Sequence, residues 1–381
     1  MKVFMTSKPK LLIVTYGHAK RQARVYVQAY YLRENFDVTV LSLGNPELEG
    51  VAFEQLHRKG NNLVAKAWQG INLLFGSYGP AIDRYDVDLS LYEKQFDLLL
   101  VHDLEPLPMS FKIAKGAPIV LDAHEYFPVQ FNESFAWRLF FKRYLIDLCK
   151  QYIPRCAAMT TVCDTLADKY GQDFGIRPEV VFSGPVKEEL TPSPVDDEHI
   201  AIVAHGAAKP NRQTEKMIYM MDHTDKRFTL SLYLVGDAKY LQFLKGLADK
   251  RDNVIWEQPV KTPELSSKTN KYDLGLYIIE PSTENALYCL PNKFFEYIQA
   301  RLGIAIAPSP EMAKITHRHE LGVVADDFTS ENLAAKLNAL TADDVRRFKA
   351  NAHLAAELYN AKASMEKMKS VLMGALSGNN A

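Results

Sequence analysis

The sequence predicts an α/β protein made of two Rossmann-like domains that face a central cleft. Three observations support this prediction. Short apolar runs alternate along the chain with amphipathic helical segments, a pattern typical of parallel sheets covered by helices. The alternation occurs twice, before and after a non-periodic stretch rich in proline and acidic residues, Glu188 to Glu198. At 381 residues, the chain is also long for a single domain.

We therefore expect three parts: an N-terminal domain over residues 1–187, a C-terminal domain over 198–341, and a helical segment over 342–381. The last segment is amphipathic from Ala342 to Leu376. We expect it to pack across both domains, with its final helix crossing back to the N-terminal domain.

The N-terminal domain begins with a strand–helix–strand unit. The strands are predicted over Leu11–Thr15 and Val38–Leu43, and the helix over Lys20–Arg33. The predicted apolar face of this helix carries Ala23, Val27, Tyr30 and Tyr31. Gly17 lies in the first turn, but the G-x-G-x-x-G fingerprint of dinucleotide-binding proteins is absent.

Polar side chains follow the next two predicted strands, Asp97–Val101 and Pro118–Leu121. The clusters are His102 with Asp103, and Asp122 with His124 and Glu125. Ligands of open parallel sheets bind at the carboxyl ends of strands, so both clusters are candidate site residues. Position 128 is proline, so His124 and Glu125 do not form the H-E-x-x-H zinc motif.

A long helix is predicted over Phe135–Tyr152, and the last strand of this half over Ala157–Val162. Aromatic and basic residues alternate along the helix between Trp137 and Tyr144. An interfacial membrane helix shows this pattern, and so does a core helix whose basic face lies in water. Both interpretations remain open.

The C-terminal domain repeats the alternation. The predicted strands are Ile200–Ala204, Phe228–Val235, Val254–Trp256, Asp273–Ile279, Ile304–Ala307 and Gly322–Val324. Helices are predicted over Gln213–Met221 and Pro263–Asn270, with another from Gly236-Asp237 to about Asp249.

The segment Leu290–Tyr297 carries the strongest chemical signal in this half. It follows a predicted strand and opens a predicted helix, with Lys293 and Glu296 in the first turns. A helix N-terminus attracts anions through its free N–H groups and dipole, and a lysine adds a full charge. A carboxylate one turn later can accept both hydroxyls of a ribose diol. These parts suit a sugar nucleotide, although a capped helix with solvated Lys and Glu explains the same residues.

Composition excludes several classes of function. A net charge of -1 gives no support for nucleic-acid binding. We find no signal peptide and no apolar run long enough to span a membrane, which predicts a cytoplasmic protein. The four cysteines form no disulfide or zinc framework, and the seven-residue spacing of Cys149, Cys156 and Cys163 predicts one buried helical face.

Two further groups resemble metal ligands. They are Asp86-Val87-Asp88 and His317-Arg318-His319. We interpret the first as surface and the second as a solvated loop, so no metal site is predicted.

In the order of its motifs, the chain resembles the GT-B glycosyltransferases, most closely the large retaining family numbered four. The resemblance covers nearly the whole length. Its motifs are Leu121 to Pro128 (LDAHEYFP), Ala204-His205-Gly206 followed by Arg212, Leu234-Val235-Gly236, and Leu290 to Tyr297 (LPNKFFEY). Each motif is weak alone, and their order and spacing carry the resemblance.

The resemblance implies roles for the matched residues. Glu296 corresponds to the carboxylate that binds the nucleotide ribose, and His124 to the histidine that contacts the donor sugar. Glu125 and Asp122, beside His124, complete the catalytic candidates. The remaining donor-binding candidates are Lys293, Arg212 and Lys209 for the diphosphate, with Gly206 and Gly17 in the turns.

One position departs from the family pattern. Many members carry a second glutamate eight positions before the ribose-binding one, and here that position is Tyr288. The loop from Glu280 to Leu290 is expected against the donor sugar. Asn285 and Glu284 are our substitutes for the missing carboxylate.

The resemblance further implies a UDP- or GDP-sugar donor, retention of anomeric configuration, and no metal or other cofactor, because Lys, Arg and a helix N-terminus can stabilise the leaving diphosphate. We hypothesise that no covalent enzyme intermediate forms. The implied acceptor is a glycan or lipid-linked saccharide of bacterial surface polysaccharide assembly. We therefore expect the protein in the cytoplasm, with peripheral contact at the inner face of the membrane as the more specific hypothesis.

Two other functions fit the architecture. A sugar-nucleotide 2-epimerase would use acid–base groups such as Asp103, Glu125 and His205 and would need no acceptor. A non-catalytic nucleotide-sugar-binding subunit is favoured only by Tyr288, and it would bind a donor without turning it over.

Overall fold

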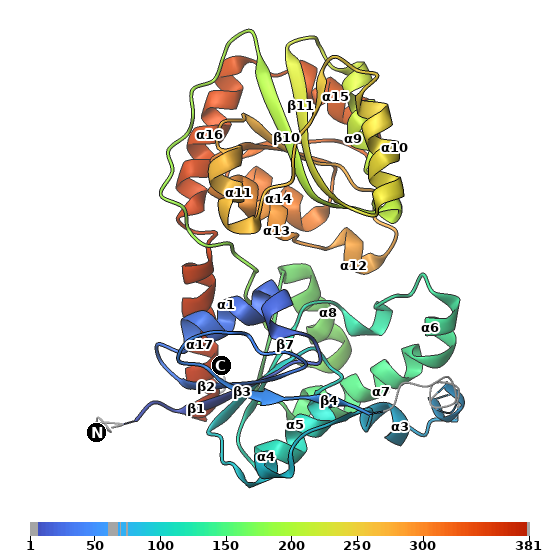
Figure 1. Ribbon diagram of the computed structural model, residues 1–381, viewed down its shortest axis with the longest axis vertical. Coiled ribbons are helices and arrows are strands. Elements are labelled where there is room, and N and C mark those ends of the chain that lie inside the picture. The colour runs from blue at the N-terminus through green and yellow to red at the C-terminus, as the bar shows by residue number, and fades with distance from the viewer. Residues whose placement is uncertain (1–6, 60–67, 69, 74, 379–381) are drawn as a thin grey trace. The chain divides into compact units, whose positions relative to one another are not determined.

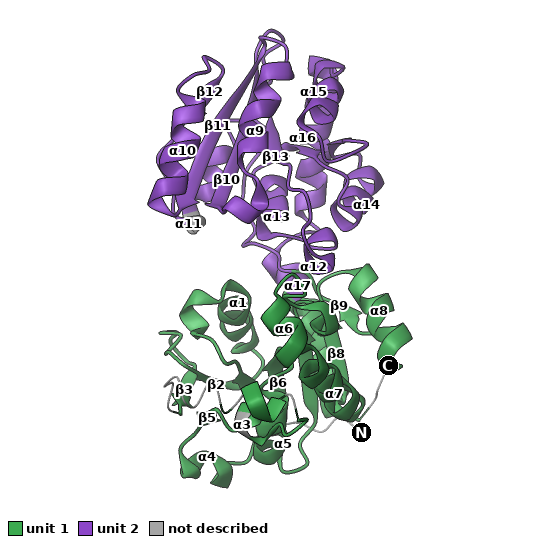
Figure 2. Cartoon of the chain, turned by 90° about the vertical axis from the view of Figure 1, so that its right-hand side faces the viewer, with its two compact units in different colours: residues 1–182, 365–381 green, residues 183–364 purple. Residues whose placement is uncertain are grey.

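The computed structural model describes residues 7–59, 68, 70–73 and 75–378 (Figure 1). The chain divides into two compact units, which Figure 2 shows in green and purple. The first unit comprises Met1–Phe182 with Met365–Ala381, and the second comprises Ser183–Ser364.

The first unit contains a seven-stranded parallel sheet in the order β3-β2-β1-β6-β7-β8-β9. The strands are β1 (Lys10–Val14), β2 (Asp37–Ser42), β3 (Ala52–Gln55), β6 (Leu98–His102), β7 (Ile119–Ala123), β8 (Ala158–Thr161) and β9 (Glu179–Val180). The central strands β6 and β7 are buried at every position, which explains their continuous apolar sequence. A short antiparallel pair, β4 (His57–Arg58) and β5 (Tyr85–Asp86), lies outside this sheet.

Helices flank this sheet. The α-helices are α1 (Ala23–Leu32), α3 (Gly79–Ile82), α4 (Leu89–Glu93), α5 (Leu107–Ala114), α6 (Phe135–Phe140), α7 (Lys142–Tyr152) and α8 (Asp164–Phe174). Three 3₁₀ segments cover Ala19–Arg21, Phe127–Val129 and Ile153–Arg155. The C-terminal helix α17 (Ala361–Leu376) contributes Met365, Met368 and Leu372 to the same hydrophobic core as β1, β2 and α1, so the chain end belongs to this unit.

The second unit contains a six-stranded parallel sheet in the order β12-β11-β10-β13-β14-β15. The strands are β10 (Ile200–Ala208), β11 (Phe228–Gly236), β12 (Val254–Trp256), β13 (Leu274–Tyr277), β14 (Gly303–Ile306) and β15 (Gly322–Val324). The helices are α9 (Glu215–Met220), α10 (Ala238–Ala248), α11 (Thr262–Thr269), α12 (Glu284–Leu287), α13 (Asn292–Gln299), α14 (Pro310–Arg318), α15 (Ser330–Asn338) and α16 (Ala342–Ala356). Two 3₁₀ segments cover Pro210–Arg212 and Met221–His223.

The connecting segment after Ser183 is bound to the second unit. Arg301, buried at the end of α13, donates from Nη2 to the Glu188 carbonyl at 2.6 Å. Gln299 accepts from the Glu188 N–H at 3.1 Å, and Asn270 donates to the Thr191 carbonyl at 3.0 Å. The acidic, proline-rich stretch is therefore an ordered strap on this unit.

Several predicted elements differ from those observed. The predicted helix over 135–152 breaks at Phe141, because α6 ends there and α7 begins at Lys142. The predicted helical segment over 342–376 consists of two helices that meet at Asn360, whose side chain donates to the Ala356 and Glu357 carbonyls and accepts from the Ala363 N–H. That one side chain ends α16 and starts α17.

The face predicted for the first helix is only partly the buried one. The helix begins at Ala23 after a 3₁₀ turn, and it buries Val25, Gln28, Ala29 and Leu32. Of the predicted set, Val27 and Tyr31 pack partly buried against the same core. Tyr30 is 41% exposed. The prediction followed the aromatic residues and missed a glutamine whose amide has a buried partner.

Other predictions also need correction. β8 is not the last strand of the first unit, because α8 and β9 follow it. The three spaced cysteines do not share a helix: Cys149 lies in α7, Cys156 follows a 3₁₀ segment, and Cys163 caps α8. His317 and Arg318 form the last turn of α14 and not a loop, whereas Asp86 and Asp88 are exposed as expected.

No helix among the described residues is long and apolar enough to cross a membrane.

Candidate functional site

The first unit places a charged cluster at the carboxyl ends of β6 and β7, centred on the buried Asp122. Arg24 donates to both Asp122 carboxylate oxygens at 2.7 Å. Gln28 donates at 2.8 Å and Thr160 at 2.7 Å. Burial alone would raise the pKa of Asp122, but Arg24 and His124 hold it well below its ordinary value. The carboxylate is therefore ionised and surrounded by donors.

His124 lies beside this carboxylate, with its side chain 26% exposed. Its Nε2 is 3.1 Å from Nδ1 of His102 and 3.4 Å from Oδ2 of Asp122. Its Nδ1 is 3.8 Å from Oδ1 of Asp103. Burial lowers the pKa of His124, but Asp103 and Asp122 outweigh burial and the net pKa is raised. Burial lowers the pKa of His102 to about 3, so that imidazole is neutral.

Three of these residues, His102, Asp122 and His124, bring their ligand atoms within 4.8 Å of one another. A metal ion here would compete with Arg24, whose guanidinium already binds both oxygens of Asp122. The arrangement is that of an ion-paired cluster and fits a cation poorly.

Glu125 and Gly17 complete the candidates in this unit. Glu125 is half-buried directly after β7, and its pKa is raised by burial and by Asp103. Gly17 follows β1, which neighbours β6 in the sheet. A Cβ at Gly17 would lie 2.5 Å from the Gln22 side-chain amide, so a larger residue there would displace that side chain.

The second unit brings Gly206 and His205, at the end of β10, against helix α13. Gly206 has φ +107, and a Cβ there would lie 3.3 Å from Nζ of Lys293. His205 is buried, with Nδ1 3.7 Å from Oε2 of Glu296. α13 begins at Asn292 after the N-cap Pro291, which supplies no side-chain acceptor for the first N–H groups. Lys293, Glu296 and the helix N-terminus therefore meet above the strand end.

Burial opposes the charged form of each ionisable side chain in this group. Burial and the neighbouring Arg212 lower the pKa of Lys293 to about 8. Burial raises the pKa of Glu296 to about 7, against the opposing effect of Lys293. Burial and Lys293 lower the pKa of His205 to about 3. Within the described part of the chain, neither Lys293 nor Arg212 forms an ion pair with a carboxylate. The two cations Lys293 and Arg212 therefore outnumber the single carboxylate of the group, Glu296.

The other predicted donor-site residues lie around it. Arg212 ends the 3₁₀ segment Pro210–Arg212, and Lys209 precedes that segment and is exposed. Glu284 and Asn285 begin the one-turn helix α12, half-buried, and Tyr288 follows its end. Glu280 pairs with Lys216 at 2.7 Å, so this loop is tied to α9.

Arg24, Gln28 and Thr160 were not predicted from the sequence as site residues, and no specific role was predicted for His102. Arg24 and Gln28 are four residues apart, so they lie one above the other on α1. A pair of polar residues at this spacing, beside the apolar positions Val25 and Ala29, is the signal that could have identified them.

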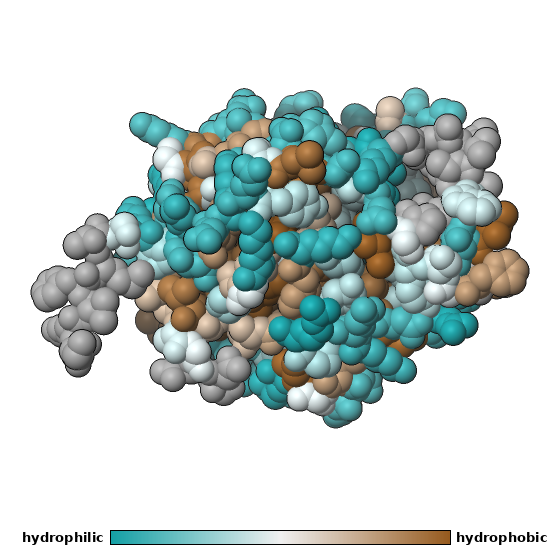
Figure 3. Space-filling view, turned by 90° about the horizontal axis from the view of Figure 1, so that it is seen from below, coloured by the Kyte–Doolittle hydropathy of each residue, from teal (hydrophilic) through white to brown (hydrophobic). Residues whose placement is uncertain are grey.

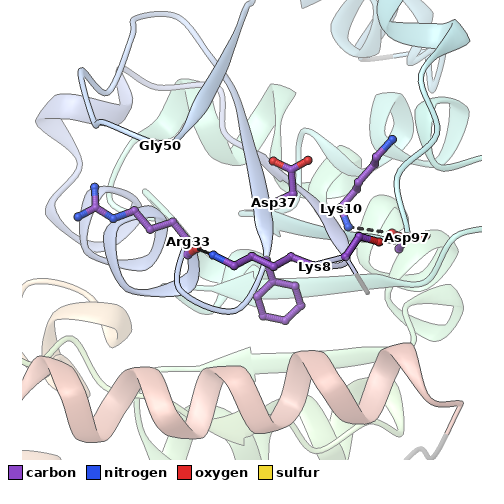
Figure 4. A pocket seen from close by; sticks show the side chains of 8 residues that line it. Lys8, Lys10, Arg33, Asp37, Gly50 and Asp97 are labelled. Atoms are coloured by element: carbon purple, nitrogen blue, oxygen red, sulfur yellow. Dashed lines mark hydrogen bonds between the residues drawn. The ribbon is translucent and has the colours of Figure 1, made fainter. Parts of the chain in front are cut away.

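A separate pocket lies at the opposite end of the first sheet. Lys8, Lys10, Arg33, Asp37 and Asp97 line it, where β1 and β2 begin and just before β6 (Figure 4). Lys10 donates its N–H to Asp97, and Lys8 binds the Arg33 carbonyl. The pocket is remote from the strand ends that carry His124.

Two parallel sheets flanked by helices, with the chain end returning to the first unit, define the GT-B fold. No protein-family model and no curated protein matches the sequence. Solved structures do match the fold over almost the whole chain, however, and GT-B glycosyltransferases are among them.

HepE from Anabaena, solved in complex with UDP and glucose, matches with a TM-score of 0.69 over 96% of this chain and 100% of its own, at 11% identity. WaaG, a glycosyltransferase involved in lipopolysaccharide biosynthesis, matches with a TM-score of 0.63 over 96% and 100%, at 14% identity. Sucrose-phosphate synthase from Thermosynechococcus elongatus gives 0.71 over 97% and 100%, at 9% identity. These identities establish the fold.

Proposed function

We propose that this protein is a glycosyltransferase that binds a nucleotide-sugar donor in its second unit. One observation carries the proposal. Lys293 is a half-buried cation beside Arg212 and an uncapped helix N-terminus, and no carboxylate lies within ion-pairing distance of it among the residues described. A site of this kind is stabilised by a bound anion. HepE, of the same fold, has been solved with UDP and with UDP-glucose.

The donor would lie along α13. Its diphosphate would bind Lys293, Arg212 and the first N–H groups of the helix, with Lys209 at the exposed rim. Its ribose diol would donate to Glu296, and Gly206 leaves room for the backbone to approach the phosphates. As the leaving group departs, these fixed positive charges stabilise it, so the reaction would proceed without a metal. Glu284 and Asn285 would face the sugar from α12.

Transfer would occur with His124 of the first unit at the donor sugar, supported by Asp122 and Glu125. We propose retention of configuration, as in family four, without a covalent enzyme intermediate. The acceptor we propose is a glycan or lipid-linked saccharide of a bacterial surface polysaccharide. WaaG, which matches over the whole of its chain, is a glycosyltransferase involved in lipopolysaccharide biosynthesis.

We propose a cytoplasmic position at the inner face of the membrane, and the surface of the first unit supports contact with a bilayer. Large apolar side chains are exposed on and beside α6: Trp68, Ile71, Phe75, Phe131, Phe135 and Leu139. A Cβ at Gly70 would contact the Phe140 ring, so the segment that carries Trp68 and Ile71 packs against α6. Apolar residues stand out at the right-hand edge of the face in Figure 3.

Basic residues accompany this apolar surface. Arg138 lies over the Phe135 ring, and Arg143 on α7 is 74% exposed. Exposed aromatic residues with interleaved cations are typical of proteins that bind anionic bilayers. We propose this surface as the site of peripheral membrane contact.

The donor site is tested by ligand binding to purified protein. UDP, GDP and their sugars are titrated by calorimetry and by thermal shift, with and without EDTA. We expect one nucleotide class to bind and to raise the melting temperature equally in both buffers. Lys293→Met should weaken that binding by roughly 10- to 100-fold, because a charge-assisted contact to the diphosphate is lost. Glu296→Gln should weaken it by roughly 10-fold.

Lys245→Met is the matched control, because Lys245 is an exposed lysine of the same unit that pairs with Asp249. It should bind the donor as the wild type does. The donor-site proposal fails if no nucleotide binds, or if Lys293→Met and Lys245→Met behave alike. Conversion of the donor in the absence of any acceptor would favour the epimerase, and binding without turnover would favour a non-catalytic subunit.

A further inference from the structure

The proposed function leaves His102 without a role, although it is buried directly against His124. The two rings meet edge to face, with their planes 67° apart. Nδ1 of His102 and Nε2 of His124 are 3.1 Å apart, within hydrogen-bonding distance. A wholly buried imidazole beside a half-buried one decides which nitrogen of the second ring is free to act.

The lone pairs of Asp122 are already used. A carboxylate has about four acceptor positions, and Arg24 takes two of them at 2.7 Å. Gln28 and Thr160 take the other two. His124 Nε2 is also nearer to His102 than to Asp122, at 3.1 Å against 3.4 Å. Asp122 still attracts the proton of His124, by a side-chain interaction at 3.4 Å as well as by its charge, but the nearer acceptor for an Nε2–H on His124 is His102 at 3.1 Å.

His102 can accept a hydrogen bond from this N–H, but it does not become protonated itself. Burial keeps the ring neutral, with a pKa of about 3. A neutral imidazole carries one N–H, so when Nδ1 accepts from His124 the proton of His102 lies on Nε2. Nε2 has no hydrogen-bond partner among the described residues. His102 thus accepts one hydrogen bond and holds the His124 ring in place.

Asp103 faces the other nitrogen of His124. Its carboxylate lies 3.8 Å from His124 Nδ1, close enough for strong attraction and too far for a direct hydrogen bond. Asp103 has φ +66, in the left-handed region, and its N–H donates to the Asp122 carbonyl at 3.1 Å. The backbone between β6 and its next helix therefore holds this carboxylate at His124 in a conformation that few side chains favour.

We propose that His102 and Asp103 are positioning residues that keep His124 protonated, with Nε2–H bound to His102 and Nδ1–H available to a substrate oxygen. His124 then acts as a hydrogen-bond donor and not as a general base. This inference rests on the proposed function only in naming the substrate, which is the nucleotide sugar or its acceptor.

The charged groups around His124 favour this state. Asp103 and Asp122 stabilise its proton and Arg24 opposes it, but the charge of Arg24 is paired with Asp122. His102 contributes no charge. Glu125, next in sequence, has its own pKa raised by burial and by Asp103. The charge of Asp103 thus raises the pKa of His124 more than any other single charge does, ahead of that of Asp122.

The test is a pH titration of the full-length protein by NMR, following the histidine Cε1–H signals. The signal of His124 is identified among the 10 histidines by its loss in His124→Gln. We expect His124 to titrate above its ordinary value of 6.5. Asp103→Asn, which tolerates the same backbone conformation, should lower that pKa by about one unit or more. Asp168→Asn, which removes an exposed carboxylate of the same unit, should leave it unchanged.

Two substitutions test the role of His102 separately from that of Asp103. His102→Leu removes the acceptor and should lower the pKa of His124, whereas His102→Asn retains an acceptor oxygen and should restore most of it. If His102→Leu does not fold, Asp103→Asn still decides the matter. A wild-type pKa at or below 6.5, or an unchanged pKa in Asp103→Asn, would overturn the proposal.

The titration needs no substrate, so its outcome is independent of whether transfer is found. Where transfer is measured, the wild-type rate should fall as pH rises through the pKa of His124. In Asp103→Asn the rate should begin to fall at a lower pH, and the difference should equal the pKa shift measured by NMR. An unchanged pH profile beside a shifted NMR titration would show that His124 is not used as a donor in the reaction.

Discussion

Lys293 and Glu296 lie one helical turn apart on α13, and both are ionised against the effect of their burial. Their shifted pKa values oppose each other in sign: Lys293 falls to about 8 and Glu296 rises to about 7. Lys293 loses its charge as pH rises above 8, and Glu296 loses its charge as pH falls below 7. Both groups carry the charges proposed for donor binding only in the interval between.

We therefore expect the affinity for a nucleoside diphosphate to be highest between about pH 7 and 8. Calorimetry from pH 6 to 9 measures it. Lys293→Arg is the informative variant, because arginine stays charged throughout this range and should remove the decline on the alkaline side. Equal affinity at all pH values in the wild type would contradict the assignment of these two residues to the donor site.

At the scale of elements, α16 is joined to the sheet of the second unit by a buried ion pair. Lys349 on α16 donates to Asp273, just before β13, at 3.0 Å. It also donates to the Tyr272 carbonyl and to Ser193 of the strap. The other oxygen of Asp273 accepts from the Ala201 N–H at the start of β10. One lysine thus links a helix, two strands and the strap.

Lys349→Met should destabilise the second unit by about 3 kcal/mol, because it leaves Asp273 buried without its counter-ion. The double variant with Asp273→Asn should recover part of this loss. Arg346→Met is the control, since Arg346 pairs with Asp343 and Asp197 on the surface, and it should destabilise the unit far less than Lys349→Met does. Chemical denaturation followed by Trp256 fluorescence, in a background with Trp68 and Trp137 replaced by Phe, reports this unit alone.

At the scale of the whole molecule, exposed apolar side chains are gathered on the first unit beside basic ones. Of these, Phe135 is 70% exposed and Phe131 is 56% exposed. A surface of this kind binds an anionic bilayer through both burial of rings and attraction of charges. Binding should therefore depend on lipid charge, on salt and on the rings themselves.

We expect the protein to co-sediment with phosphatidylglycerol-containing vesicles, and less with phosphatidylcholine vesicles or in high salt. Phe131→Ser with Phe135→Ser should reduce binding by roughly 10-fold or more. Leu354→Ser with Leu358→Ser is the matched control, because these leucines are equally exposed on the second unit. Equal loss in both double variants, or no binding to either lipid, would contradict a membrane surface at α6.

Some of this architecture is already contained in local sequence. Continuous apolar runs such as Leu98–Val101 predict buried parallel strands, because both faces of such a strand are covered. The GT-B fold class predicted from the alternation and the motifs is confirmed. The grouping of Lys293, Glu296 and Gly206 could also be predicted, since strand ends and helix N-termini of a parallel sheet meet at one edge.

Which polar residues contact one another depends on the tertiary structure. Arg24 and Asp122 are 98 residues apart, and their ion pair forms because α1 covers the edge where β7 ends. Likewise the breaks at Phe141 and Asn360 depend on packing and capping that helical periodicity does not register. Sequence periodicity records which face of an element is apolar, whereas the partner of a buried charge is set by contacts between distant elements. For this reason local sequence is enough to predict the fold class and to single out His124 and Glu296 as candidates, whereas the contacts that His102 and Asp103 make with His124 appear only in the structure.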